Sequence, residues 1–394
     1  MAFQEILPEI LPGAKIKVFG VGGAWCNTVN RMIKEWIDGV EFVAVNTDAQ
    51  VLATSLAHKT INIWLNITKG LGAWANPEIW RKAAEESLES IKAELVDTDM
   101  VFITAGMWWW TGTGAAPVIG QLAKSMGILA VGVVTKPFSF EWKRRFEHAL
   151  EWLTKMRESV DTLIVIPNDK IFNIIDKKTT FKQAFSMIDK ILYLGVQGIS
   201  DLIIRPGDIN IDFADIRMIM QGSGTALLGI GYGQGEDRAI DAARRAIDNP
   251  LLEASLEGAK NIIFAVTGWE DLTPIEVQEA ARVVEEIADP DAMIVWWMTF
   301  DESYEGEVKV SIIATWFPEQ VQETMIKSVW TRGGAISKLW TPSTWTRRSS
   351  TGAWYIWRAM SDEWVSSSSE AQEEQKEERD FDTPAIIRKK LLNG

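Results

Sequence analysis

The stretch Ile16-Lys-Val-Phe-Gly-Val-Gly-Gly-Ala-Trp-Cys-Asn27 decides how the rest of the chain is interpreted. A run of β-branched and aromatic residues passes directly into a glycine-rich loop, and an amphipathic segment follows. At such a strand-to-helix junction, backbone N–H groups and the helix dipole favour a phosphate. The loop nearly matches G-x-G-x-x-G, but Trp25 occupies the third glycine position. As a dinucleotide-binding fingerprint it is weak, and a plain tight turn is an equally good interpretation.

Four similar apolar runs follow before residue 170, namely EFVAVNTD, MVFITAG, ILAVGVVTKP and TLIVIPND. Each run ends in glycine or polar residues, and helical patterns separate the runs. This order predicts the buried parallel strands of a doubly wound α/β sheet. Ligands of such sheets bind beyond the carboxyl ends of the strands. The loops that follow the runs are therefore the candidate sites.

The rest of the chain divides by its pattern. Residues 180–205 keep a helical apolar spacing and are long enough to connect two domains. Beyond them, TALLGIGYG, NIIFAVTG, AMIVWWMTF and VKVSIIAT flank helices rich in Ala, Glu and Arg. We therefore expect an N-terminal extension (1–14), a first domain (15–179), a core helix (180–205) and a second, smaller α/β domain with its own sheet (206–318).

The C-terminal segment has a different composition. Within residues 319–379, SSSSEAQEEQKEERD is nearly free of apolar residues, so we expect a variable, disordered linker. Residues 380–394, which include DFDTPAIIRKK, regain apolar and basic character. The residues alone leave open a short partner-binding peptide or a frayed terminus.

Composition restricts the class of protein. The 394 residues are 47% hydrophobic, and the net charge of -14 opposes non-specific binding to nucleic acid or anionic lipid. Cys26 is the only cysteine, which excludes an internal disulfide and a multi-cysteine zinc site. No stretch reaches the roughly 20 uncharged apolar residues of a membrane span, and the start lacks the features of a secretion signal. The sequence predicts a cytoplasmic protein whose partners are proteins or small ligands.

A second glycine-bearing loop follows MVFITAG. In Gly106-Met-Trp-Trp-Trp-Thr-Gly-Thr-Gly114, small residues at a strand-to-helix junction let the backbone approach an anion closely. The loop is therefore a second phosphate-binding candidate. Neither GxxxxGKS nor GxxxxGKT occurs anywhere, which disfavours a P-loop NTPase.

Two further loops carry charged groups. Glu141 could accept hydrogen bonds from ribose hydroxyls, and Arg145 could contact a ring or a phosphate, although a solvated helix start also explains both. Asp212 and Asp215 are three residues apart and become neighbours on a helix. Such acids can orient water or hold a metal ion. Taken alone, they are better explained as a helix N-cap with acids at the positive dipole end.

Taken in order, these loops resemble FtsZ, the family of tubulin-like GTPases of bacterial cell division. The resemblance spans roughly residues 15–318 and the extreme C-terminus. It rests on GVGGA..N, VNTD, GLGA..NPE, TGTGAAPV, TKPF.FE..RR, IPND, VQGISDLI.RPG.IN.DFAD and GIG...GE.RA..AARRAI. Several independent motifs in the correct order make a chance match implausible.

The resemblance implies a tubulin-like fold in which a GTP-binding domain is joined by the core helix to a GTPase-activating domain. GTP would be hydrolysed to GDP and phosphate with Mg²⁺, in an active site completed between adjacent subunits of a head-to-tail protofilament. The nucleotide-binding residues that it implies are Gly22, Gly23, Asn27, Gly72, Ala73, Gly106, Thr111, Gly112, Thr113, Gly114, Glu141, Arg145, Asn168, Phe185 and Asp189.

The catalytic residues that the resemblance implies are Asn210, Asp212 and Asp215. It also favours the binding interpretation of the C-terminal peptide, which would bind membrane tethers and regulatory proteins at the mid-cell division ring. The residues concerned are Asp382, Pro384, Ile386, Ile387 and Arg388.

The sequence departs from the family in one consistent way, in that Trp occupies positions where the family has glycine. The chain contains 20 Trp residues, and the positions concerned include Trp25, Trp74, Trp108, Trp109, Trp110, Trp142 and Trp316. GGG and TGG codons differ by one base, so a recurrent G-to-T change would produce this pattern. Glycines of phosphate loops often have φ > 0, and each strained non-glycine residue costs about 1–3 kcal/mol. Nucleotide affinity is therefore expected to fall sharply.

Two alternatives to an active GTPase follow. One is a nucleotide-binding-impaired structural homologue of the same fold that binds division partners without hydrolysis. The other is an NAD-dependent oxidoreductase, which Trp25 in the fingerprint and the lack of a plausible proton-transfer histidine both disfavour.

Overall fold

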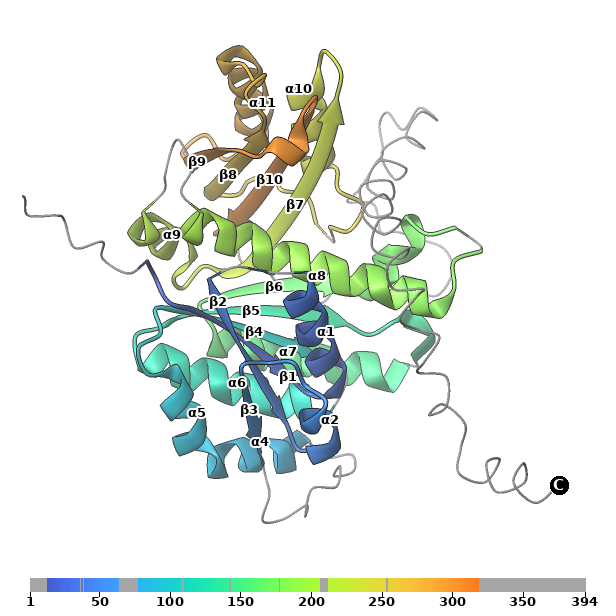
Figure 1. The fold of residues 1–394 in the computed structure, drawn as a ribbon, viewed down its shortest axis with the longest axis vertical. Helices are drawn as coiled ribbons and strands as arrows, with labels where there is room; N and C mark the ends of the chain where they lie inside the picture. The colour runs from blue at the N-terminus through green and yellow to red at the C-terminus, as the bar shows by residue number, and fades with distance from the viewer. Residues whose placement is uncertain are drawn as a thin grey trace, which may run out of the picture. The chain divides into compact units, whose positions relative to one another are not determined.

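A computed structural model describes residues 13–35, 37, 39–63, 77–107, 110–141, 143–176, 178–205, 212–252 and 254–318. The first half alternates strands with helices (Figure 1). Its elements are β1 (Ile16–Val21), α1 (Gly23–Lys34), β2 (Val40–Asn46), α2 (Ala49–Ala53), β3 (Lys59–Asn62), α4 (Pro77–Glu86), α5 (Leu88–Leu95), β4 (Met100–Gly106), α6 (Trp110–Ser125), β5 (Leu129–Lys136), η1 (Ser139–Glu141), α7 (Lys143–Ser159), β6 (Thr162–Pro167) and η2 (Asn168–Asn173).

A long helix leads into the second half. The remaining elements are α8 (Phe181–Ile204), α9 (Phe213–Met220), β7 (Gly224–Gln234), α10 (Arg238–Ile247), β8 (Asn261–Gly268), α11 (Pro274–Glu285), β9 (Met293–Phe300), η3 (Glu302–Tyr304) and β10 (Glu307–Thr315). The nine apolar runs identified in the sequence are confirmed as strands, and the expected core helix as α8. Within the described ranges, no helix combines the length and apolar character needed to cross a bilayer.

The described strands form one sheet in the order β3-β2-β1-β4-β5-β6-β7-β10-β8-β9. The pairs among β1 to β6 are all parallel. Strand β7 continues the sheet, because it pairs in parallel with β6 at residues 224–226 and antiparallel with β10 over most of its length. The second sheet predicted from the sequence is thus hydrogen-bonded to the first.

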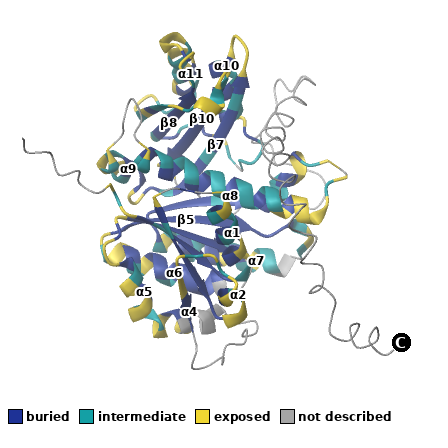
Figure 2. Ribbon diagram, viewed as in Figure 1, coloured by how far each residue is buried: buried dark blue, intermediate teal, exposed yellow. Residues whose placement is uncertain are grey.

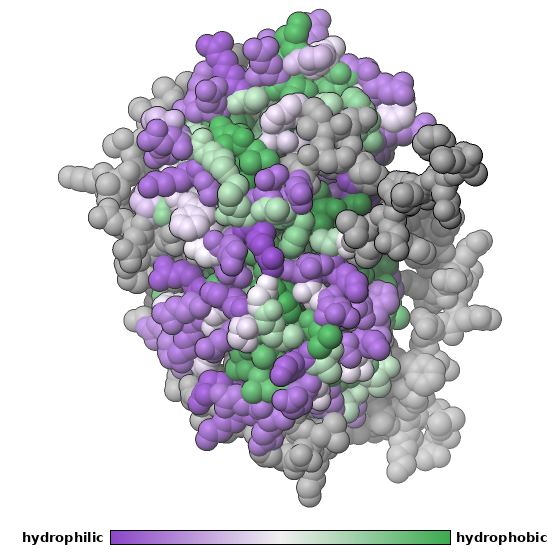
Figure 3. Space-filling view, turned by 90° about the vertical axis from the view of Figure 1, so that its left-hand side faces the viewer, coloured by the Kyte–Doolittle hydropathy of each residue, from purple (hydrophilic) through white to green (hydrophobic). Residues whose placement is uncertain are grey.

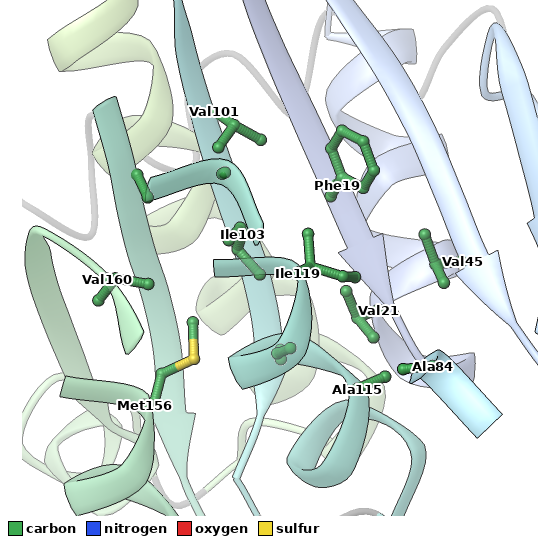
Figure 4. Close-up of a cluster of buried hydrophobic side chains, with 14 of the residues drawn as sticks. Phe19, Val21, Val45, Ala84, Val101, Ile103, Ala115, Ile119, Met156 and Val160 are labelled. Atoms are coloured by element: carbon green, nitrogen blue, oxygen red, sulfur yellow. The ribbon is translucent and has the colours of Figure 1, made fainter. Parts of the chain in front are cut away.

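Helices cover both faces of the first half. Helix α6 packs against β1, β4 and β5, and α4 and α7 lie against α6. Figure 4 shows the resulting core, in which Phe19, Val21 and Val45 of the strands lie near Ala115 and Ile119 of α6. On the opposite face α1 packs on β1 and β2, and α8 contacts α1. The strands are therefore the most buried elements (Figure 2), which explains why β4 and β5 are apolar along their whole length.

Helix α8 begins at a capping box. The Thr180 hydroxyl accepts from the backbone N–H of Gln183 at 3.3 Å, and the Gln183 side chain accepts from the backbone N–H of Thr180 at 2.9 Å. These two bonds satisfy donors that a helix start otherwise leaves open. The helix then runs for 24 residues, a length of about 36 Å.

A glycine stripe on β7 sets the packing of the second half. A Cβ atom at Gly231 would lie 2.0 Å from the carbonyl oxygen of Ala242, and one at Gly233 would lie 1.8 Å from that of Arg238. The opposing face of α10 is lined by the small side chains of Ala239, Ala242 and Ala246, all buried. Helix and strand therefore meet at backbone contact distance, which only glycine on the strand permits.

Trp316, which directly follows β10, has the left-handed φ of 60°. Its indole Nε1 donates to the carbonyl oxygen of Ile219 at 2.9 Å. We expect Trp316→Gly to be more stable than Trp316→Ala by about 1 kcal/mol, because both lose the indole but only alanine keeps a Cβ in the left-handed region. Urea unfolding of the two variants measures this difference.

The reference for that comparison is an ordinary helical site, where the alanine variant of a protein is more stable than the glycine variant. Lys82 is an exposed helical residue, and its variants Lys82→Ala and Lys82→Gly provide this reference. Equal stability of the two Trp316 variants, or a more stable alanine variant, would show that residue 316 is unstrained.

Candidate nucleotide site

The first loop of the site joins β1 to α1. Gly22 has φ 96°, a conformation that favours glycine, and caps the helix start. Its backbone N–H donates to the carbonyl oxygen of Val45 at 2.9 Å, and its carbonyl oxygen accepts from Cys26 at 3.0 Å. Gly23 begins α1, whose first turn carries no acidic residue. The positive end of this helix dipole is therefore not offset by a carboxylate of its own first turn.

The second loop joins β4 to α6. A Cβ atom at Gly112 would lie 3.0 Å from the carbonyl oxygen of Val21 and 3.2 Å from that of Gly106. The start of α6 thus lies directly on the carboxyl ends of β1 and β4. Thr113 and Gly114 are buried there, and the Thr113 hydroxyl donates to Gly106 at 3.5 Å. The first turn of α6 also lacks an acidic residue.

The two helix starts follow neighbouring strands, because β1 pairs with β4. Phosphate groups bind well at helix N-termini of this kind. The structure therefore brings together Gly22 and Gly23 of one loop with Gly106, Gly112, Thr113 and Gly114 of the other. Asn27 lies exposed in the second turn of α1.

Trp25 is helical and only 4% exposed. Its φ is not positive, so the backbone strain expected of Trp at glycine positions applies to Trp316 and not to Trp25. The indole Nε1 of Trp25 has no hydrogen-bond partner, and an unpaired buried donor costs about 1–3 kcal/mol. Trp74, Trp108, Trp109 and Trp142 lie outside the described residues, as do the side chains of Trp110 and Thr111.

Cys26, the neighbour of Trp25, is buried against Asn46, and burial raises the pKa of its thiol to about 12. We expect iodoacetamide at pH 8 to modify the folded protein only as fast as it opens, because the thiolate is the nucleophile. The neutral thiol contributes stability that is fully present below about pH 8.5, the unfolded pKa, and is lost as the pH rises towards 12.

Mass spectrometry of the alkylated protein, with and without urea, measures this protection. Cys26→Ala is the control for the pH effect, because this variant lacks the alkaline loss of stability that comes from the thiol. Labelling of the folded protein at the rate of a free thiol peptide would contradict the expectation.

Asn168 follows β6, which is two strands beyond β4 in the sheet, and is 2% exposed. Its side-chain oxygen has no hydrogen-bond partner. Buried acceptors are nearly always paired, so this oxygen is suited to a donor that a ligand supplies. Phe185 of α8 lies edge-on to Phe138, with ring centroids 5.6 Å apart, and is 47% exposed.

Glu141 and Arg145 form an ion pair, with Arg145 Nη1 2.8 Å from Glu141 Oε2. The other carboxylate oxygen of Glu141 accepts from the backbone N–H of Phe138 at 3.2 Å. This places Glu141 between the end of β5 and the start of α7. The sequence assigned the two residues to one site, and the structure shows them in direct contact.

Asp189 is held by α1. The Thr28 hydroxyl donates to one carboxylate oxygen at 2.7 Å, and Arg31 Nη1 donates to the other at 2.8 Å. Burial raises the pKa of Asp189, against the opposing effects of Thr28 and Arg31. Thr28 and Arg31 were missed by the sequence reasoning, although their three-residue spacing after the glycine loop places both on one helix face.

The predicted catalytic acids lie at the other end of α8. Asp212 caps α9, because its carboxylate accepts from the backbone N–H of Ala214 at 3.1 Å, and Asp215 lies in the first turn. Figure 1 shows α9 beyond the C-terminal end of α8. Phe185 and Asp189 lie in the first half of α8, and from Phe185 to the end at Ile204 the helix spans about 28 Å.

Several predicted residues lie outside the described ranges. They are Gly72, Ala73, Asn210, Asp382, Pro384, Ile386, Ile387 and Arg388. Within the described part of the chain, no three His, Cys, Asp or Glu side chains are grouped to hold a metal ion.

Comparison with known proteins agrees with this geometry. Residues 15–176 match the Tubulin/FtsZ family, GTPase domain, and residues 224–318 match the FtsZ family, C-terminal domain. The solved empty FtsZ dimer of M. jannaschii is 45% identical, with a TM-score of 0.72 over 77% of this chain and 88% of that chain. CetZ2 from Haloferax volcanii, solved as a GTPγS-bound protofilament, is 18% identical, with a TM-score of 0.65 over 80% and 97% of the two chains, and shows the fold alone.

The fold and the two helix-start loops thus define a GTPase domain of the tubulin type, joined to a second domain. The chain belongs to the Tubulin/FtsZ family. The matched GTPase domain implies GTP or GDP as its ligand.

Proposed function

We propose that this chain binds and hydrolyses GTP and forms head-to-tail filaments, with each active site completed by the next subunit. One observation carries the proposal. The loops suited to hold the phosphates lie at the carboxyl ends of β1 and β4, whereas α9, which carries Asp215 and is capped by Asp212, is hydrogen-bonded through Arg217 to the carbonyl oxygen of Gly127, just before the amino end of β5. One chain therefore cannot bring these loops and these acids to the same phosphate, whereas a heterologous contact between identical chains can.

The phosphates would lie at the starts of α1 and α6, where backbone N–H groups and two helix dipoles stabilise negative charge. Glu141 would accept from the ribose. Asn168 would pair its free oxygen with guanine, and Phe185 would pack on the base. Asp189 retains acceptor capacity for guanine N–H groups, because two oxygens carry about four lone-pair sites and Thr28 and Arg31 occupy only two.

In the assembled site, Asp212, Asp215 and Asn210 of the next subunit would orient water for attack on the γ-phosphate. Mg²⁺ would arrive with the nucleotide, because this ion prefers phosphate oxygens and water. For the biological role we propose the mid-cell division ring in the cytoplasm. The C-terminal peptide, residues 382–388, would bind membrane tethers and regulatory proteins.

Mixing two inactive variants tests the proposal. Asp212→Ala removes a catalytic acid, and the double variant Asn168→Ala with Asp189→Ala removes base recognition. In an equimolar mixture, about a quarter of the subunit contacts join an intact pocket to an intact acid, so about a quarter of the wild-type phosphate release should return. No recovery from the mixture, although the wild type is active, would contradict a shared site.

The second candidate function is a structural homologue that does not turn over nucleotide, and the Trp residues at family glycine positions favour it. Light scattering and phosphate release with GTP and Mg²⁺ separate the two functions. Assembly without hydrolysis supports the second. Absence of GTP binding, restored by Trp108→Gly, Trp109→Gly and Trp110→Gly together, would show that these indoles block a GTPase site.

A further inference from the structure

Strand β9 is the outer strand of the sheet, because among the described strands it pairs with β8 alone. The backbone N–H of Met293 donates to the carbonyl oxygen of Lys260 at 2.8 Å. Beyond the strand end, the backbone N–H of Asp301 donates to the carbonyl oxygen of Gly268 at 2.8 Å. In a parallel ladder every second residue turns its backbone groups to the same neighbour. The odd-numbered residues therefore face β8. The even-numbered residues of β9 turn their N–H and C=O groups to the open edge.

Two of these even-numbered residues, Ile294 and Trp296, line a groove. A hollow of about 830 Å³ lies beside α11 and β9, and its apolar lining includes Phe264, Val277, Ala281, Ile294 and Trp296. Trp296 is 43% exposed, and Phe300 at the end of the strand is 36% exposed. Figure 3, viewed from the left-hand side of Figure 1, shows hydrophobic residues between hydrophilic ones in the upper part of the molecule.

Proteins usually protect such an edge with Lys, Pro or a very short strand. Strand β9, with the sequence MIVWWMTF, has none of these devices over its eight residues. It is thus an open template for another strand, with apolar side chains on the groove side.

The charges around β9 indicate the charge of the partner that this edge can bind. Glu285, Glu286 and Asp289 line the groove, and Asp291 and Glu302 flank the two strand ends. Glu286 has a distant, exposed ion-pair partner in Arg282, at 3.7 Å. Pairing of β9 with β9 of a second copy, in either direction, would place acidic ends opposite acidic ends, which is destabilising. The same carboxylates would attract a basic partner.

We infer that β9 and this groove bind an extended segment of another protein in which every second residue faces the groove, and in which these groove-facing residues are apolar beside Trp296 and Lys or Arg near the start of β9. The segment would add a strand to the sheet at β9. Its backbone would pair with the even-numbered residues, its apolar side chains would enter the groove beside Trp296, and its cations would lie near Glu285, Glu286 and Asp289.

The probe is the acetylated, amidated heptapeptide KTITITK, in which isoleucine and lysine share one face. It carries a fluorescein and is titrated with the full chain without nucleotide. Anisotropy should show saturable binding. Met298→Pro should weaken it at least tenfold, because proline at this even position removes an edge N–H without removing a bond to β8. The triple variant Glu285→Gln, Glu286→Gln, Asp289→Asn should weaken binding and reduce its salt dependence.

Control peptides replace lysine with glutamate or N-methylate alternate residues, and neither should bind. If Met298→Pro melts at a lower temperature than the wild type, Trp296→Glu serves as the second variant, because it changes the groove and leaves the backbone free to pair. Equal binding to Met298→Pro and Trp296→Glu would overturn the inference. So would the absence of saturable binding by the wild type, or sedimentation showing a dimer that Met298→Pro abolishes. Nucleotide is absent throughout, so the result is independent of GTPase activity.

Discussion

Gly231→Ala should lower the free energy of unfolding by about 4 kcal/mol or more, or prevent accumulation of folded protein. The added Cβ atom would lie 2.0 Å from the carbonyl oxygen of Ala242 and 2.5 Å from the backbone N of Ala246. Both contacts are backbone atoms of α10, so no side-chain rotation relieves them. The helix would have to move away from β7, which opens the core of the second half.

Gly198→Ala is the matched control for this substitution. Gly198 lies inside α8, and a Cβ atom there would meet nothing within 4 Å. Alanine should therefore stabilise the protein by about 0.5–1 kcal/mol through helix propensity. Urea unfolding curves of the two variants should shift in opposite directions. A loss below about 1 kcal/mol for Gly231→Ala would show that α10 is not held at backbone contact with β7.

Arg238→Met should cost about 3 kcal/mol, because it leaves two carboxylates without their cation. Arg238 is only 6% exposed. Its Nε donates to Glu276 at 2.7 Å, and its Nη2 donates to the carbonyl oxygen of Asp271 at 2.9 Å. An ion pair also joins its Nη1 to the Asp271 carboxylate. The side chain thereby ties α10 to the first turn of α11.

The pH dependence of stability provides a second readout. Burial favours a higher pKa for Glu276, but its bonds to Arg238 and Thr273 outweigh that effect and lower the pKa. The stability from Glu276 is therefore present above its unfolded pKa of about 4.3 and is lost as the pH falls through the lower, folded value. In Arg238→Met this acid-dependent loss should shrink.

Arg282→Met is the control, because Arg282 lies in the last turn of α11 and its side chain is 80% exposed. Its loss should change stability by less than about 0.5 kcal/mol. Thermal unfolding from pH 3 to 8 compares the three proteins. Equal stability of the Arg238 and Arg282 variants would contradict the role given to the buried guanidinium.

Much of the fold follows from local sequence. Buried parallel strands are apolar along their whole length, so runs such as MVFITAG could be recognised without knowledge of their neighbours. Strand β3 was not predicted, because Lys59-Thr-Ile-Asn62 has four residues and one buried side chain. The continuity of the sheet through β7 could not be predicted either, because it depends on pairing between residues about 60 positions apart.

The candidate site was predictable where backbone geometry decides it. Glycines after strands indicate loops that wrap an anion, and Gly22 does have the left-handed φ that only glycine adopts readily. Contacts between side chains of distant elements could not be predicted in this way. The bonds of Asp189 to Thr28 and Arg31 depend on how α8 lies on α1, and no local pattern specifies that distance.

The short pairing between β6 and β7, at residues 224–226, also affects folding during synthesis. The first six strands can pair as soon as β6 leaves the ribosome, whereas β7 starts 57 residues after β6 ends. At about 5–20 residues per second, synthesis of that interval takes roughly 3 to 11 s. Throughout this time β6 is an open strand edge on a nascent sheet. Chaperone capture and misassembly of nascent chains therefore compete with folding at this stage of translation.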